Sequence, residues 1–533
     1  MANSKFSRRG FLKGAAVGAG ASALSGGTVA GQSPPPVQGS SWERPPKQHG
    51  NDLNLIIIVA DTFRRDNLAA YGPKWLDSLE TPNLDGFARQ AGIFEDYYSE
   101  LLPTIPLRRT LYTGRRGIPA DYYPHHESVQ LPGWHPLYYE DVTLAEILSA
   151  AGYVTSLVSD LYHEFKPGRN FQRGFQSYQH IRGQEIDAYG TTPHGLLDVS
   201  DIVAPEYLKN LPNLQNFLSQ YKANRNHWSQ QGESLSQLVA QTATGWLREN
   251  FRQRPFYLHV ESFDPHEPWD PPARFLEKYL PHAAGPTYLE PPYDTVALPD
   301  SIKQRLRANY AGEVNCVDTW IGTLLSLIGD LGLFENTIVV FLSDHGALLG
   351  ERGQFLKGPD KLRGQVTHPP LLIRTPDQRF AGKRVQGFIQ PPDIVPSLLP
   401  LLGLTAPPRV TGSNLWPLVT GESKGDREYV VQTYGWVGAV RDKEWSYSEI
   451  WKPEARQDNY HVSPGAPLAP YRPQLYNLQE DPHELTDVAD MFPDVAKRYS
   501  VKLKEYIASG EGKTRGSFNA RPSLDLQEGL YAK

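Results

Sequence analysis

The residues best suited to chemistry are an aspartate and a histidine that stand together after an apolar run. Asp344 and His345 follow residues 337–342 and precede Gly346. At the end of a strand, an adjacent carboxylate and imidazole can both turn toward one divalent cation. A turn in which the aspartate caps the backbone is the alternative for such a triplet. Asp61 favours the metal site, because it ends a second apolar run where a carboxylate is costly to bury without a cation or a hydrogen-bond donor.

A hydroxyl group and an arginine stand four residues apart in a third segment. Thr104 precedes Arg108 at what the pattern predicts to be the start of a helix. This segment resembles the sulfatase signature, in which a Cys or Ser is followed by any residue, a proline, a small residue and an arginine, and after a spacer by Thr-Gly-Arg. The match covers Pro106, Arg108 and residues 113–115, and Thr104 occupies the position of the residue that sulfatases modify.

Further blocks of the chain resemble the sulfatase family in the family's own order. They are residues 61–64 with 71–72 and 81–85, the Asp-Pro-His segment 264–268, the metal and lysine block 343–350 with Lys357, and the ending 474–478 with 481–484. On these blocks the chain is identified as a member of the sulfatase family, within the alkaline phosphatase superfamily.

The resemblance implies a metal site and a nucleophile. Asp61, Asp344 and His345 would bind the cation, and the hydroxyl of Thr104 would be both a further ligand and the nucleophile. A bound cation lowers the pKa of a coordinated hydroxyl and neutralises charge on a sulfuryl or phosphoryl oxygen, so these roles are chemically consistent.

The resemblance also implies an anion pocket around the transferred group. Arg108, Lys357 and His266 would surround that group, and positive side chains complement an oxyanion. His163 matches the family's histidine in a Lys-x-His segment, and an ordinary loop histidine is the alternative at this position.

Three positions depart from the family pattern. Thr104 stands where sulfatases carry the Cys or Ser that becomes formylglycine, so no formylglycine is expected. Thr62 replaces the family's second opening aspartate, and Leu161 replaces the lysine of the Lys-x-His segment. The cation site therefore has one carboxylate fewer, and the anion pocket is altered.

The threonine has a chemical consequence for the substrate. A formylglycine hydrate can expel sulfate by breaking a carbon–oxygen bond, whereas a sulfated threonine would be trapped. A phosphorylated threonine can be hydrolysed by in-line attack of water at phosphorus. We therefore expect cleavage of a phosphate or phosphonate ester or diester rather than a sulfate ester. The alternatives are a true sulfatase acting on a sulfated aryl or glycan substrate, a non-catalytic binding relative, and a transferase that differs only in the acceptor.

The expected cofactor is one divalent metal ion. Family sulfatases use calcium, and the imidazole of His345 softens the site toward manganese, with zinc less favoured. The expected substrate is a small-molecule or glycan ester. The oligomeric state is not predicted.

Hydrophobic runs predict an α/β fold with a large, mainly parallel mixed sheet flanked by helices. Nearly continuous aliphatic runs, typical of strands buried on both faces, occupy residues 53–60, 154–158, 256–260, 337–342 and 371–373. Apolar residues at steps of three and four predict a helix over 310–328. We assign 51–424 to the catalytic domain and 425–533 to a smaller C-terminal α+β subdomain.

The N-terminus predicts export. Two arginines, Arg8 and Arg9, precede a run rich in Gly and Ala that ends in a small-residue site, so residues 1–30 are interpreted as a twin-arginine signal peptide. Residues 31–50 form a proline-rich tether. The expected location is the periplasm or the extracellular space.

Composition excludes some partners. The net charge is only −6, from 53 basic and 59 acidic residues, so no global field would attract nucleic acid. No second long apolar segment follows the signal, so no stable membrane span is expected. The single cysteine, Cys316, is predicted to be a packed core residue.

Overall fold

The computed structural model describes most of the chain after the predicted tether. The described residues are 49–122, 129, 131–192, 197–203, 212–293, 297–425, 427–452, 471–510 and 513–517, and they belong to one unit, Ser41–Lys533. The predicted signal peptide and residues 31–48 of the tether lie outside the described residues.

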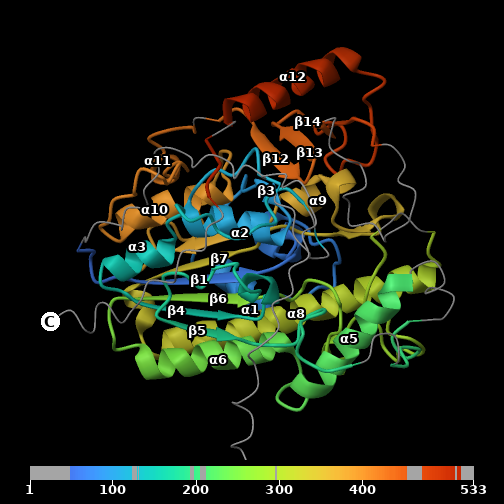
Figure 1. Ribbon diagram of the computed structural model, residues 1–533, viewed down its shortest axis with the longest axis horizontal. Coiled ribbons are helices and arrows are strands. Elements are labelled where there is room, and N and C mark those ends of the chain that lie inside the picture. Colours follow the sequence, from blue (N-terminus) through green and yellow to red (C-terminus); the bar gives the residue numbers. More distant parts are fainter. Residues whose placement is uncertain are drawn as a thin grey trace, which may run out of the picture. The chain divides into compact units, whose positions relative to one another are not determined.

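An eight-stranded mixed sheet forms the centre of the fold (Figure 1), in the order β11-β2-β10-β7-β1-β6-β4-β5. β10 runs antiparallel to both of its neighbours, and every other adjacent pair is parallel. The predicted fold class is confirmed. The strands are β1 (Asn54–Ala60), β2 (Gly92–Phe94), β4 (Val154–Ser159), β5 (Ser177–His180), β6 (Phe256–Ser262), β7 (Thr337–Leu342), β10 (Leu371–Arg374) and β11 (Arg384–Val385).

The burial of strand β1 on both of its faces explains why its sequence is a continuous aliphatic run. All seven of its residues are buried. Because successive side chains of a strand point to opposite faces, Leu55, Ile57 and Val59 enter one core cluster, whereas Ile56, Ile58 and Ala60 enter another. Both faces of the strand must therefore be covered by helices.

Helices cover the two faces of the sheet in separate layers (Figure 1). α2 (Thr104–Thr113), α3 (Leu144–Ala150) and α10 (Ile394–Leu401) contribute to the first cluster, and α1 (Pro82–Ala88), α6 (Leu235–Asn250) and α8 (Asp300–Asp330) to the second. α8 begins ten residues before the predicted helix and ends two residues after it, and Cys316 lies fully buried in it, as predicted. The remaining helices are α5 (Pro212–Trp228), α7 (Ala273–Leu276), α9 (Gly364–Thr367) and α11 (Trp416–Thr420).

A second sheet, of five strands, lies under helix α12 (Pro493–Gly510) in Figure 1. Its order is β15-β14-β13-β12-β3, and all pairs are antiparallel except β12 with β3. The predicted small C-terminal sheet and helix are confirmed. The strands are β3 (Leu101–Leu102), β12 (Val430–Tyr434), β13 (Val437–Arg441), β14 (Trp445–Ile450) and β15 (Gln474–Asn477); a separate hairpin joins β8 (Leu348–Leu349) to β9 (Phe355–Leu356).

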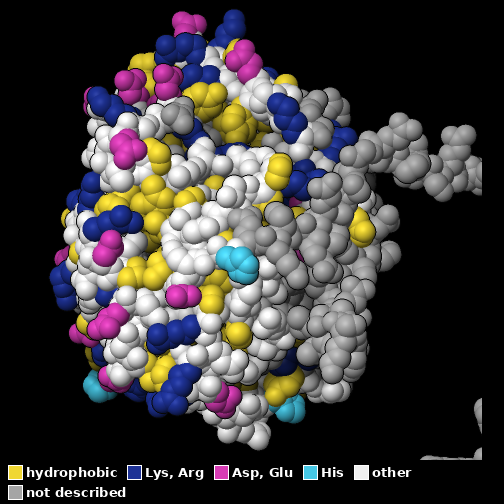
Figure 2. Space-filling view, turned by 90° about the vertical axis from the view of Figure 1, so that its left-hand side faces the viewer, with side chains coloured by type: hydrophobic (Ala, Val, Ile, Leu, Met, Phe, Trp, Pro, Cys, Tyr) yellow, Lys and Arg dark blue, Asp and Glu magenta, His cyan; other side chains and the backbone are white. Residues whose placement is uncertain are grey.

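The surface agrees with the small net charge. Figure 2 shows Lys and Arg side chains interspersed with Asp and Glu over the visible face. Within the described part of the chain, no helix combines the length and the apolar character that a membrane span requires.

A buried ion cluster fixes the C-terminal end of helix α2. Asp141 is buried and pairs with Arg109 (Nε to Oδ2, 2.9 Å) and Arg115 (3.0 Å). These arginines and the burial have opposite effects on the carboxyl pKa of Asp141: burial raises it, and the arginines lower it below its usual range. Arg115 also donates to the carbonyl oxygen of Lys513 (2.7 Å). The Thr-Gly-Arg arginine thus ties α2 to the C-terminal segment.

Removing the Asp141 carboxylate should strongly destabilise the protein. Asp141→Ala leaves two buried guanidinium groups without their partner, and we expect it to lower the free energy of unfolding by about 3–5 kcal/mol in urea titrations. Asp201→Ala is the control, since Asp201 pairs with Lys222 at 2.7 Å while 61% of its side chain is exposed; we expect a change of at most about 1 kcal/mol there. Equal losses in the two variants would contradict this assignment.

Candidate metal and catalytic site

The register of two central strands brings Asp61 and Asp344 together. β1 and β7 are adjacent and parallel, and Val59 pairs with Leu342. Each aspartate stands two residues beyond its member of this pair. One ligand atom from each of Asp61, Asp344 and His345 lies within 4.8 Å of the others, and all three side chains are fully buried. The predicted carboxylates and imidazole therefore form one group.

The backbone beside the group holds the carboxylates in place. The Thr62 amide donates to Asp344 Oδ1 (3.1 Å), and the Thr62 hydroxyl donates to Asp61 Oδ1 (2.7 Å). Thr62 has a φ of 58°, which a β-branched residue rarely adopts, and its carbonyl accepts a hydrogen bond from Tyr310 (2.9 Å). Strain of this kind concentrates at functional sites.

Gly346 is required by a close approach of two backbone segments. A Cβ atom at this position would lie 2.2 Å from the carbonyl oxygen of Gln365, closer than any real contact. The glycine therefore lets the chain turn immediately after His345.

The group fits a divalent cation. Asp344 Oδ2 and His345 Nε2 are buried without a well-directed hydrogen bond, although Asp344 Oδ2 lies 2.8 Å from an Arg108 guanidinium nitrogen. Burial and the neighbouring Asp344 carboxylate raise the pKa of Asp61, because two buried negative charges in contact repel each other. Burial lowers the pKa of His345 to about 4, which leaves the imidazole neutral, the form that binds metals. A cation at this position would relieve the repulsion and satisfy both atoms.

Arg108 lies among carboxylates at the same end of the sheet. Its guanidinium group contacts Asp61 (3.0 Å), Asp344 (2.8 Å) and Glu261, and all of these side chains are fully buried. Thr104 is the first residue of α2 and is 2% exposed. It lies one helical turn before Arg108, and residues four apart share a face of a helix. Thr104 and Arg108 therefore lie on the same face of α2.

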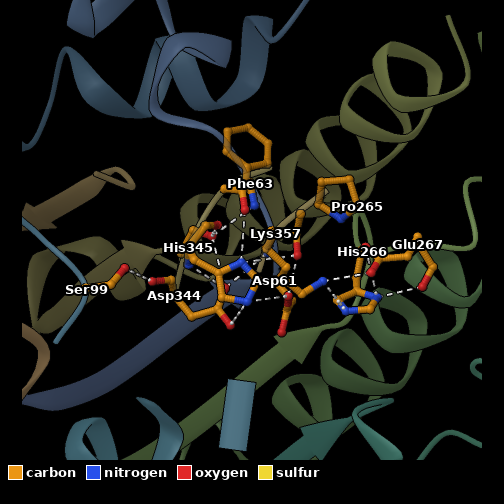
Figure 3. Close-up of polar contacts among 12 residues, drawn as sticks. Asp61, Phe63, Ser99, Pro265, His266, Glu267, Asp344, His345 and Lys357 are labelled. Atoms are coloured by element: carbon orange, nitrogen blue, oxygen red, sulfur yellow. Dashed lines mark hydrogen bonds and ion pairs between the residues drawn. The ribbon is translucent and has the colours of Figure 1, made fainter. Parts of the chain in front are cut away.

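A second group contains the predicted Lys357 and His266 (Figure 3). Lys357 Nζ lies 2.8 Å from His266 Nε2 and 2.8 Å from Glu267 Oε1. His266 Nδ1 lies 2.6 Å from the carbonyl oxygen of Glu267, so Nδ1 carries the proton and Nε2 accepts from the lysine. Burial, together with the Lys357 charge, lowers the pKa of His266 to about 4.

Burial opposes the Lys357 charge, but Glu267 and Asp61 outweigh it and raise the lysine pKa. Lys357 therefore stays protonated and faces both groups, which places a fixed positive charge between the candidate metal ligands and His266.

His163 joins the second group through a glutamate. It lies in a short 3-10 helix, Tyr162–Phe165, and its Nε2 is 3.3 Å from Glu185 Oε2. Glu185 Oε1 is 3.5 Å from His266 Nδ1. The ring of Phe263 stacks on His266, with 4.0 Å between ring centres, and meets His163 edge-on at 6.3 Å. The structure thus places the predicted His163 beside His266.

Some residues of the site were not found by sequence reasoning. Glu261 ends strand β6, and a carboxylate at the end of an otherwise apolar strand is a signal that could have revealed it. Glu185 and Ser99 offered no such signal; Ser99 donates to the carbonyl oxygen of Asp344 (2.5 Å). Asp264, the first residue of the Asp-Pro-His segment, accepts hydrogen bonds on both oxygens, from Gln184 and Ser236.

The mainly parallel sheet, its smaller antiparallel companion and the buried Asp-Asp-His group at the strand ends define an alkaline-phosphatase-like ester hydrolase. A family model described as Sulfatase matches residues 53–404, and the chain belongs to the sulfatase family.

The relatives include both sulfatases and phosphonate hydrolases. An arylsulfatase of Clostridium perfringens is 24% identical over 497 residues, covering 87% of this chain and 95% of the relative. The multifunctional alkaline phosphatase superfamily protein PehA of Trinickia caryophylli is 23% identical, covering 88% and 98%. The crystal structure of the phosphonate monoester hydrolase of Agrobacterium radiobacter has a TM-score of 0.61 at 22% identity, covering 86% and 96%.

Divalent cations should stabilise the folded protein through the Asp-Asp-His group. At one hundred times the dissociation constant, manganese or calcium should add about 2.7 kcal/mol and raise the melting temperature. Asp344→Asn and His345→Ala should lose most of this gain because each removes a ligand atom. The control is His282→Ala, since His282 is 94% exposed and should leave the gain intact. A gain that persists in both ligand variants would exclude this group as the binding site.

Proposed function

We propose that this protein hydrolyses a phosphate diester or a phosphonate monoester, with Thr104 as the nucleophile. The observation that carries the proposal is a threonine at the first position of α2, one turn before an arginine that contacts Asp61 and Asp344. The family signature places the reacting residue at this position, and threonine is not the residue from which formylglycine is made.

The first half of the reaction transfers the phosphoryl group to threonine. The O–H bond of Thr104 breaks, its oxygen forms a bond to phosphorus, and the bond from phosphorus to the leaving alcohol breaks. The alcohol oxygen takes the electron pair and a proton, so the proton that Thr104 loses is balanced by the one that the alcohol gains. Thr104 begins a helix of ten residues, and the N-terminal end of a helix favours an anion. A divalent cation held by Asp61, Asp344 and His345 would supply positive charge that lowers the pKa of a hydroxyl and stabilises the oxyanion.

The second half regenerates the threonine. Water forms a bond to phosphorus, and the bond from phosphorus to the Thr104 oxygen breaks, which returns the hydroxyl. A sulfated threonine lacks an equally accessible route, so the residue type favours phosphorus over sulfur. Lys357, kept charged by Glu267, complements the oxyanion, and His266 assists the leaving alcohol or the attacking water.

The cation that suits the ligand set best is manganese or calcium. Two carboxylates suit either hard ion, and the single imidazole shifts the preference toward manganese; zinc is less favoured. The proposed substrate is a small-molecule or glycan ester. We also propose that residues 1–30 export the protein by the twin-arginine route, so that it acts in the periplasm or outside the cell.

A sulfate ester is the second candidate substrate, because the chain belongs to the sulfatase family and an arylsulfatase is among its relatives. It would require a threonine to perform the chemistry that formylglycine performs in sulfatases.

A panel of esters tests the proposal. Phosphonate monoester, phosphate diester, phosphate monoester and aryl sulfate are offered to the purified protein with manganese or calcium and with chelator. We expect phosphonate or diester cleavage that chelator removes. Thr104→Ala should lower kcat by on the order of 10³-fold or more, because the nucleophile is lost.

The matched variant is Thr104→Ser, which keeps the hydroxyl and should keep most of the activity if its intact mass excludes conversion to formylglycine. Sulfate cleavage as the dominant activity of the wild type would overturn the preference for phosphorus. Absence of turnover for every ester would favour a non-catalytic binding protein.

A further inference from the structure

Glu185 joins two histidines that lie far apart in the sequence. One carboxylate oxygen is 3.3 Å from His163 Nε2, and the other is 3.5 Å from His266 Nδ1. His163 follows strand β4, and His266 follows strand β6, which is its neighbour in the sheet. A single carboxylate therefore spans the gap between two adjacent strand ends.

A tyrosine hydroxyl and the contacts of the surrounding loop hold Glu185 in this position. The Tyr162 hydroxyl donates to Glu185 Oε2 (2.8 Å). Glu185 has a φ of 40°, in the region that residues other than glycine rarely adopt, and the surrounding structure must stabilise it. Asp187 fixes the same loop by pairing with Arg182 (2.6 Å). The Glu185 side chain is only 12% exposed.

Charges of both signs lie around His266, so the loss of one carboxylate changes the pKa of its imidazole. Burial and Lys357 lower the pKa of this imidazole, and Glu267 and Glu185 raise it. Glu290 also lies near Glu267 and Glu185, where its pKa is raised by burial and by those two carboxylates. Removing the Glu185 charge would make a protonated imidazole less stable.

We propose that Glu185 is a positioning residue for proton transfer to the leaving alcohol. Its two oxygens lie 3.3 Å from His163 Nε2 and 3.5 Å from His266 Nδ1, and its negative charge stabilises a protonated imidazole at either position. In the transfer, the N–H bond of the imidazolium breaks and its proton forms an O–H bond with the alcohol oxygen, while the bond from phosphorus to that oxygen breaks. This inference rests on the proposed ester hydrolysis.

Leaving-group dependence gives the first test, with the full-length, metal-supplemented protein. Glu185→Gln keeps the shape of the side chain and removes its charge. The substrates are the methyl and 4-nitrophenyl esters of phenylphosphonic acid. Methanol needs a proton in order to leave, whereas 4-nitrophenolate leaves without one. We therefore expect kcat/KM to fall about 10–100-fold for the methyl ester and less than about threefold for the 4-nitrophenyl ester.

The pH profile should change with a defined sign. A proton donor must be protonated, so activity falls as pH rises through the pKa of the imidazole. Because Glu185→Gln lowers that pKa, the alkaline fall of kcat/KM should begin at lower pH. Asp187→Asn is the matched control: it loosens the same loop without touching either histidine, and the ratio of the two esters and the pH profile should stay as in the wild type.

Histidine NMR gives a readout that needs no turnover. The ring signals of His163 and His266 are assigned with His163→Gln and His266→Gln, and their titrations are compared between wild type and Glu185→Gln. We expect both imidazoles to titrate at lower pH in Glu185→Gln. Unchanged titrations, or equal losses for the two esters, would overturn the inference. Altered titrations with no ester cleaved by the wild type would overturn the proposed function and leave the positioning by Glu185 intact.

Discussion

Two buried carboxylates in contact at the ends of neighbouring strands determine how much positive charge this site requires. Asp61 and Asp344 are fully buried, and their mutual repulsion would be costly without compensating positive charge. Arg108 provides part of that compensation by contacting both, but Glu261 takes up much of its charge. Two carboxylates with a neutral His345 then carry two negative charges, which a divalent cation would balance.

The need to hold these charges explains how the two sheets cooperate. Strand β3 belongs to the small sheet through its pairing with β12, yet it ends only two residues before Thr104. Helix α2 then carries Thr104 and Arg108 to the end of the large sheet. At its other end, Arg109 and Arg115 pair with Asp141. The C-terminal part of the chain therefore contributes to the site by fixing both ends of the helix that bears the proposed nucleophile.

Much of this arrangement could be predicted from the sequence because the central strands are buried on both faces. Such strands must be apolar throughout, so β1 and β7 are visible as runs, and the aspartates that end them are conspicuous. The orientation of β10 was not predictable in this way, since an apolar run of four residues has the same composition in either direction. The two- and three-residue strands β11 and β2 are too short to show a period.

The polar partners within the site were harder to predict than its ligands. Glu185 is separated from His266 in the sequence by helices α5 and α6 and strand β6, and it lies in a loop whose composition carries no signal. Glu261 stands out near the end of its strand, but its role depends on Arg108, which reaches it only in the folded chain. Sequence blocks identify which side chains react, whereas the residues that orient them are selected by tertiary contacts.

Two of the departures from the family pattern change the charge of the site in opposite directions. Thr62 replaces an aspartate and removes one negative charge beside the cation site, and its hydroxyl instead donates to Asp61. Leu161 replaces a lysine and removes one positive charge from the anion pocket; it is fully buried, where an unpaired ammonium group would be costly. A site that loses one charge of each sign keeps its overall balance while its local field changes. Under the proposed function, these two changes and the threonine at position 104 would together favour a chemistry distinct from that of a formylglycine enzyme.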